Sequence, residues 1–305
     1  MNRILVRALG VVSLAALAVG YTAGCAADDP PVNGRYRDVS PDQITVTVFK
    51  TDKLVALERE QERLRAECMA GRGFTQLTKM DAPVDSQPFV DLNVTPPAFA
   101  VQTEDAARQY GFGKNEPAQP AHVISSDPAF DRAFEQCGTV AAEKIGVDFP
   151  RVRSQLYELI NKINVEVTRM SMTGPAAGDF DRMTAPLLDC LDRHDFHGSG
   201  EQKRSLDSYG VGRPMGQVTG PEPAAPKKIP GTVEILPPVA ERTYVPTPAE
   251  SALAVATTRC AREIGYAEKY VAHRLAVVRD VLTSHEAQLV RVTDRLQELA
   301  AAQAA

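Results

Sequence analysis

Apolar residues recur at helical spacing through most of the chain, and most regularly near its C-terminal end. There they alternate in steps of four and three, the heptad pattern of a helix that packs along one seam. The seam consists of Val271, Leu275, Val278, Leu282, His285, Leu289, Val292, Leu296 and Leu299. Its polar member, His285, is expected to set the packing register rather than to act as a base. We predict one long helix from Glu268 to Ala300.

A second long helix is predicted from Phe149 to Met172, with Gly174-Pro175 ending it. Its apolar positions are Phe149, Val152, Leu156, Ile160, Ile163, Val167 and Met170. Each long helix needs a partner, because an exposed stripe of that length is larger than soluble monomers tolerate. We therefore expect the two helices to pack against each other, antiparallel or side by side.

The terminal helix is the longer of the two, so its last heptads are predicted to remain uncovered. They form the candidate surface for an envelope protein or for self-association; the alternative is a frayed helix end. The candidate residues on that surface are Leu289, Val292, Leu296 and Leu299.

Shorter helices are predicted between stretches rich in glycine and proline. They are Leu54 to Ala70, Glu104 to Tyr110, a helix opened by Asp127-Pro128, Asp181 to Arg193, and a helix opened by the capping box Thr247-Pro-Ala-Glu250. Residues 44 to 49 alternate β-branched side chains and are predicted to be extended, and residues 233 to 236 could form a brief strand. Because no β-α-β alternation appears, a parallel α/β sheet is not expected. The predicted fold class is mainly α: a disulfide-tied helical bundle with two long amphipathic helices.

Residues 1–24 have the charge and order of a secretory signal peptide. Arg3 and Arg7 precede an apolar stretch of 13 residues, Ala8 to Gly20. That stretch is shorter than the roughly 20 residues that a membrane span needs. Thr22-Ala-Gly-Cys25 is a lipobox, which predicts cleavage before Cys25 and lipidation of its thiol; an ordinary cleaved signal and an uncleaved anchor are the alternatives. We expect a lipid-anchored protein on the extracytoplasmic face of a bacterial cell membrane.

Residues 25–39 contain few large apolar side chains and are predicted to be a flexible tether. The chain contains no basic patch, and over its full length acidic residues outnumber basic ones by 39 to 34. This composition argues against nucleic acid as a partner. No motif indicates a cofactor, so none is expected.

Four cysteines remain if Cys25 carries lipid, and outside the cytoplasm an even set indicates disulfides. The chain shows an internal repeat around them. In each half a cysteine is followed six residues later by phenylalanine, then by a Tyr-Gly-x-Gly turn, then by a second cysteine and a long helix. The repeat divides the chain into halves 40–178 and 179–305, which we expect to form one combined domain. It favours the pairs Cys68–Cys137 and Cys190–Cys260, whereas the competing pairing, Cys137–Cys190 with Cys68–Cys260, would join the halves.

Three stretches of the chain resemble a group of actinobacterial lipoproteins of unknown function. They are Cys25 with its lipobox, the segment Glu67-Cys-Met-Ala-Gly-Arg-Gly-Phe74, and Glu250 to His285 with Cys260 between them. The resemblance covers the two ends of the chain better than its middle. The chain departs from the family pattern at residues 255–258, Val-Ala-Thr-Thr, where an aspartate is expected. The resemblance implies a location on the outer face of the cell membrane and a cysteine pattern. It implies no catalytic residues.

One cluster of residues could bind a metal. Cys190, His194 and His197 have zinc-ligand spacing, with aspartates at 189, 192 and 195. Because Cys190 is expected in a disulfide, the favoured interpretation is a solvated helix end without metal, and a metal site at His194 and His197 is the weaker alternative. No Gly-x-Ser-x-Gly or His-Glu-x-x-His motif is present. We therefore expect a non-catalytic binding or scaffolding lipoprotein; the alternative is an envelope hydrolase or metal-binding protein that uses His194 and His197.

Overall fold

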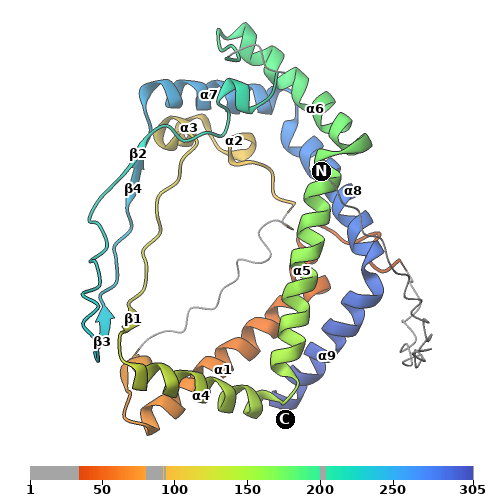
Figure 1. Ribbon diagram of the computed structural model, residues 1–305. Coiled ribbons are helices and arrows are strands. Elements are labelled where there is room, and N and C mark those ends of the chain that lie inside the picture. Colours follow the sequence, from red (N-terminus) through yellow and green to blue (C-terminus); the bar gives the residue numbers. More distant parts are fainter. Residues whose placement is uncertain (1–33, 80–91, 93, 200–203, 305) are drawn as a thin grey trace, which may run out of the picture.

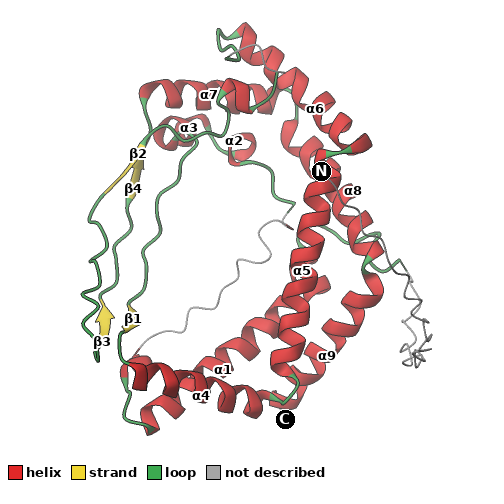
Figure 2. Ribbon diagram, viewed as in Figure 1, coloured by secondary structure: helices red, strands yellow, loops and turns green. Residues whose placement is uncertain are grey.

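The computed structural model describes residues 34–79, 92, 94–199 and 204–304 (Figure 1). The predicted signal peptide, the lipidation site Cys25 and the tether up to residue 33 lie outside these residues. The described chain is mainly helical, as predicted (Figure 2). Its helices are α1 (Thr51–Gly71), α2 (Ala98–Val101), α3 (Glu104–Tyr110), α4 (Pro128–Ile145), α5 (Phe149–Met172), α6 (Gly174–Arg193), α7 (Pro248–Glu263), α8 (Tyr266–Ser284) and α9 (Glu286–Ala304), with short turns η1 (Ile44–Val48), η2 (Gln76–Lys79) and η4 (Asp207–Tyr209). The strands are β1 (His122–Ser125), β2 (Gln217–Thr219), β3 (Val233–Leu236) and β4 (Thr243–Val245).

The two predicted long helices pack antiparallel in the body of the molecule (Figure 1). At one end of the pair, Arg295 of α9 donates to Asp148, next to the first residue of α5, at 2.9 Å. At the other end, Arg274 of α8 donates to Ser171 of α5, also at 2.9 Å. The prediction that the stripes cover each other is confirmed.

The terminal helix is interrupted, however, at the one polar position of its seam. α8 ends at Ser284 and α9 begins at Glu286, with His285 between them. His285 is only 7% exposed, and its Nε2 lies 2.8 Å from an oxygen of Glu166 in α5. The prediction of one continuous helix is therefore wrong, because the chain breaks where this imidazole pairs with a carboxylate across the interface.

The predicted partner surface at the end of this helix is also wrong. Leu289 and Leu296 are fully buried, Leu299 is 6% exposed and Val292 is half-buried. They belong to the largest apolar cluster, where α1 packs on α9 and forms a further wall beside α5. The prediction considered only two long helices, and the third helix covers the extra heptads.

The predicted tether ends earlier than residue 39. The backbone N–H groups of Gly34 and Arg35 donate to the carboxylate of Glu286 at 2.9 and 3.2 Å. Tyr36 and Val39 are buried in the main apolar cluster, and the guanidinium of Arg279 donates to the Val39 carbonyl. Residues 34–39 are therefore part of the folded body.

The segment that follows is also more compact than predicted. Residues 44–48 form η1, one turn of π-helix, instead of an extended segment. Ile44, Val48 and Phe49 are all buried in the main cluster. In an extended segment, Val48 and Phe49 would point to opposite sides, so all three side chains reach the same core only if the segment coils. Tertiary packing therefore overrides the β-branched pattern here.

Two disulfides connect helices that are distant in sequence, and both predicted pairs are confirmed. Cys68–Cys137 joins α1 to α4, with 5.6 Å between the Cα atoms. Cys190–Cys260 joins α6 to α7, with 5.7 Å between the Cα atoms. We call the end of α1 with α4 the first lobe, and α6 and α7 with α2 and α3 the second lobe. The competing pairing across the halves is excluded.

α6 begins at Gly174, which has φ +67°, with Pro175 in its first turn. The Gly-Pro pair therefore starts a helix as well as ending one, since proline fits the first turn of a helix. The predicted short helix from Asp181 is the later part of α6, and the predicted boundary between the halves, at 178/179, lies within it.

Each half of the chain sends a segment to the lobe of the other half. The first-half segment with α2 and α3 lies against α7, and Phe99 is buried in the apolar cluster of the second lobe. In return, β3 of the second half pairs antiparallel with β1 of the first, and Val233 packs against the cluster around Met69 and Phe130. β2 and β4 form a second antiparallel pair. The halves are thus interlocked, with helices along one side of Figure 1 and extended segments along the other.

None of the described helices is long and apolar enough to cross a membrane.

Candidate functional site

The second lobe contains a hollow of about 450 Å³ where α3, the end of α6 and α7 meet. It is lined by Arg108, His194, Phe196, Ser251, Ala252, Val255, Ala256 and Arg259. The lining combines an apolar wall with two guanidinium groups and one imidazole. Such a mixture of apolar surface and a few polar groups is typical of small-ligand sites.

α7 supplies one wall of the hollow. The predicted cap at its start is confirmed, because the Thr247 side chain accepts from the Glu250 N–H at 3.2 Å. The inner face of α7 packs into the lobe through Leu253 and Cys260, so its outer face is left to line the hollow. Ser251 on that outer face donates to the Arg108 carbonyl at 2.9 Å, which fixes the end of α3 against α7.

The two arginines that line the hollow, Arg108 and Arg259, form ion pairs with carboxylates of α3. We call them the rim arginines. Arg259 donates to Glu104 at 2.8 Å, and Arg262 donates to the same carboxylate at 2.7 Å. Arg108 donates to Asp105 at 2.6 Å. The hydrogen bond from Arg259 lowers the pKa of Glu104. A guanidinium has five N–H donors, so each rim arginine has donor capacity beyond a single carboxylate.

A buried carboxylate fixes the turns that support the lobe. Glu250 is fully buried, and it accepts hydrogen bonds from the N–H groups of Phe112 and Met215 and from the Tyr244 hydroxyl, at 2.8, 2.9 and 2.8 Å. Burial raises the pKa of Glu250, but the hydrogen bonds outweigh burial and the pKa is lowered. The first Tyr-Gly-x-Gly turn fits against this carboxylate, since a Cβ at Gly111 would lie 2.4 Å from its Oε1. Glu250 is therefore a structural anion, whereas the sequence analysis assigned it a role only in the cap of α7.

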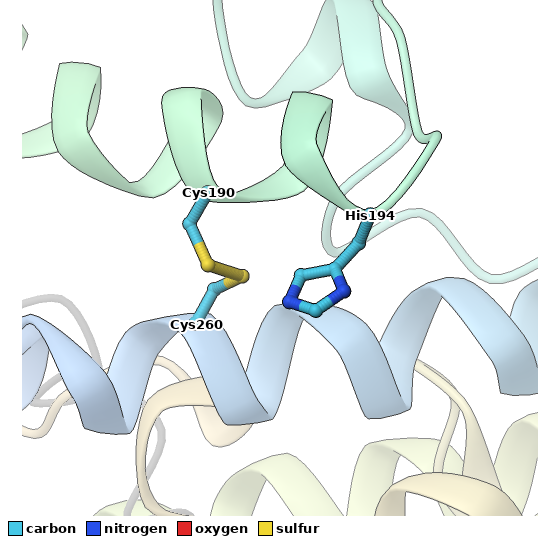
Figure 3. Close-up of side chains that lie close together, drawn as sticks. All are labelled: Cys190, His194 and Cys260. Atoms are coloured by element: carbon cyan, nitrogen blue, oxygen red, sulfur yellow. A yellow bond between two sulfur atoms is a disulfide. The ribbon is translucent and has the colours of Figure 1, made fainter.

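His194 lies beside the disulfide of the second lobe. Figure 3 shows its ring next to the bond between Cys190 and Cys260, between the two facing helices. The ligand atoms of these three residues lie within 4.8 Å of one another, and they are the only group of three or more potential metal ligands found among the described residues. While the disulfide is intact, the imidazole is the only good zinc ligand of this group, because zinc binds thiolate sulfur and the two sulfurs are bonded to each other.

The predicted pair of histidines does not converge on one site. Nδ1 of His197 lies 3.2 Å from Asp192, whose carboxylate also accepts from the Tyr209 hydroxyl at 2.7 Å and from Arg204. The Tyr209 hydrogen bond is the largest cause of the lowered pKa of Asp192. His197 and its nearby carboxylate thus belong to the second Tyr-Gly-x-Gly turn, whereas His194 faces the disulfide.

Sequence reasoning found His194 and missed the rest of the hollow. Arg108 and Arg259 are far apart in the chain and come together only because the first-half segment crosses to the second lobe. The one local signal was the outer stripe of α7, where alanine and valine occupy a face that should be polar. Within the described residues nothing couples Ser251 to a histidine.

No protein-family model matches this chain, and no curated protein or solved structure shows significant similarity to it.

Proposed function

We propose that this protein is a non-catalytic binding or scaffolding lipoprotein of the bacterial cell envelope, anchored through Cys25 on the extracytoplasmic face of the membrane. The observation that carries the binding role is the hollow in the second lobe. Its walls come from both halves of the chain: the disulfide joins α6 to α7 within the second half, and the exchanged segment holds α3 of the first half against α7. A preformed site of this kind loses little conformational entropy when a ligand binds.

The chemistry of the lining indicates the class of ligand. Phe196 and Val255 offer apolar surface, and Arg108 and Arg259 offer planar donors suited to carboxylate or phosphate groups. We infer that the hollow accepts an anionic group carried on an apolar body, either a small amphipathic molecule or the end of a partner chain.

Further contacts favour binding over catalysis in the described part of the chain. The Ser251 hydroxyl donates to a backbone carbonyl, and Glu250 accepts three hydrogen bonds in a buried position. His285 pairs with Glu166 in the packed body of the protein. A nucleophile needs an adjacent base, and these side chains hold structural contacts instead.

The test fills the hollow. Ala252 is exposed on α7 at the hollow, so Ala252→Trp blocks it, and Ala276→Trp on the exposed face of α8 is the matched control. Intact membranes would be crosslinked, and the lipoprotein extracted in detergent and analysed by mass spectrometry. We expect one bound species with wild-type and Ala276→Trp protein and its loss with Ala252→Trp. Equal recovery from both variants would exclude the hollow as the binding site, and recovery of no species from the wild type would refute the binding role.

A further inference from the structure

The two disulfides occupy equivalent places in the repeat but have different neighbours. One turn after Cys68 on α1 comes Arg72, and one turn after Cys137 on α4 comes Val140. Arg72 cannot bind a metal, and its guanidinium donates to the Gln136 side chain. At the corresponding places in the second lobe stand His194, one turn after Cys190, and Glu263, one turn after Cys260.

Both of these second-lobe side chains point toward the sulfur atoms. The His194 ring lies beside the disulfide (Figure 3), and its ligand atom is within 4.8 Å of both sulfurs. A carboxylate oxygen of Glu263 lies 3.7 Å from Sγ of Cys190. Tetrahedral zinc with sulfur, nitrogen and oxygen ligands keeps neighbouring ligand atoms about 3.3–3.8 Å apart, as follows from its bond lengths. The group within 4.8 Å contains the two cysteines and His194, whereas Glu263 is near the Cys190 sulfur alone. Once the sulfurs separate, the exposed Glu263 side chain must turn toward the other three ligand atoms to complete that spacing.

We propose that the second lobe contains a redox-gated zinc site, closed by the Cys190–Cys260 disulfide and opened when that bond is reduced. A dithiol reductant attacks one sulfur, forms a mixed disulfide and leaves as its own disulfide, so the bond between Cys190 and Cys260 gains two electrons and two protons. Zn²⁺ then replaces the two thiol protons, which are released to solvent, and His194 and Glu263 complete four-coordinate binding.

The hollow gives this site an entry path. Both cysteines are fully buried, so the disulfide has no direct exposure to solvent. His194 and Ala256, one helical turn from Cys190 and Cys260 respectively, line the hollow. Movement of the His194 ring at the end of α6 would open the route from the hollow to the sulfurs. The same residue therefore covers the disulfide in the oxidised form and binds the metal in the reduced form.

The test uses full-length protein in which only one disulfide remains. The double variant Cys68→Ser/Cys137→Ser keeps the second-lobe pair, and Cys190→Ser/Cys260→Ser keeps the first-lobe pair as the matched control. Both would be reduced with a phosphine, which competes poorly for metal, and titrated without oxygen with Co²⁺ and then Zn²⁺. We expect the first variant to bind one Co²⁺ with the visible spectrum of a tetrahedral thiolate site, and Zn²⁺ to displace it. The control should bind at least about tenfold more weakly.

Adding His194→Ala to the first variant distinguishes a metal site that includes His194 from metal binding by the two thiols alone. Loss of a ligand should weaken binding about tenfold or more, since even residues that only support a metal ligand contribute about 10–100-fold. Circular dichroism follows the fold in parallel. If reduction unfolds the lobe, Zn²⁺ should restore its helical signal, and His194→Ala should prevent this. Equal affinity of the two double variants, no effect of His194→Ala, or an unfolded lobe that Zn²⁺ does not restore would each overturn the proposal.

Discussion

The substitution Glu250→Gln should destabilise the second lobe while leaving the shape of the side chain unchanged. The carboxylate accepts from Phe112 N–H through Oε1 and from Met215 N–H and the Tyr244 hydroxyl through Oε2. A glutamine can keep its one carbonyl oxygen at only one of these two places. Its NH₂ group then faces at least one backbone N–H, and two donors oppose each other in a fully buried position.

The size of the effect follows from these contacts. If the amide oxygen stays with Phe112, the hydroxyl of Tyr244 can rotate to accept from the new NH₂ group, but Met215 N–H loses its acceptor. An unsatisfied buried donor costs about 1–3 kcal/mol. Loss of the negative charge weakens the remaining bonds as well, because bonds to charged groups contribute about 1.5–3 kcal/mol and neutral ones about 1 kcal/mol. We expect a total loss of about 2–4 kcal/mol in the free energy of unfolding.

The same carboxylate makes stability depend on pH. Its pKa in the folded protein lies below the ordinary value of 4.5, so the folded state favours the charged form. The contribution is fully present above the unfolded-state pKa, near 4.5, and is lost as pH falls through the lower folded-state pKa. The difference in stability between wild type and Glu250→Gln should therefore shrink as the solution is acidified below about pH 4.5.

Urea unfolding of the oxidised protein, followed by circular dichroism, measures both effects. Glu222→Gln is the matched control, because Glu222 is exposed in the loop between β2 and β3. That control should change the free energy of unfolding by less than about 0.5 kcal/mol. A Glu250→Gln protein as stable as the control near neutral pH would show that the buried carboxylate does not hold the turns together.

Three further outcomes are expected. Replacing Cys25 by alanine should abolish detergent partitioning and lipid labelling, and labelled Cys25→Ala protein would refute the anchor. Leu296→Ala should cost about 2–5 kcal/mol in urea unfolding, because Leu296 is fully buried between α9 and its neighbours, whereas an exposed partner surface would give almost no change. Gly113→Ala should cost about 1–3 kcal/mol by the same assay, since its Cβ would lie 2.2 Å from the Tyr244 ring, and an unchanged midpoint would contradict that contact.

The sequence predicted the local parts of this fold well. The limits of α5 and α3, the caps at Asp127 and Thr247, and both disulfide pairs follow from spacing, capping residues and the repeat. These features depend on residues close together in sequence or on equivalence between the halves. The errors concern long-range packing, because no local pattern shows that α1 covers the end of α9 or that the terminal helix breaks where His285 meets Glu166.

The candidate site lies beyond sequence reasoning for the same physical reason. Repeated halves would be expected to fold side by side, each with its own loop, but here each loop lies on the other half's lobe. Exchange of this kind buries the same apolar residues and forms the same local contacts as separate folding, so the pattern of either half cannot distinguish the two arrangements. It does change which side chains meet. Arg108 reaches α7 only through the exchange, and the hollow beside His194 exists because α3 of one half packs against α7 of the other. The disulfides and the exchanged segments therefore act together. Each disulfide fixes the helices of one lobe, and the segment from the first half supplies the wall that makes the second lobe a candidate binding site.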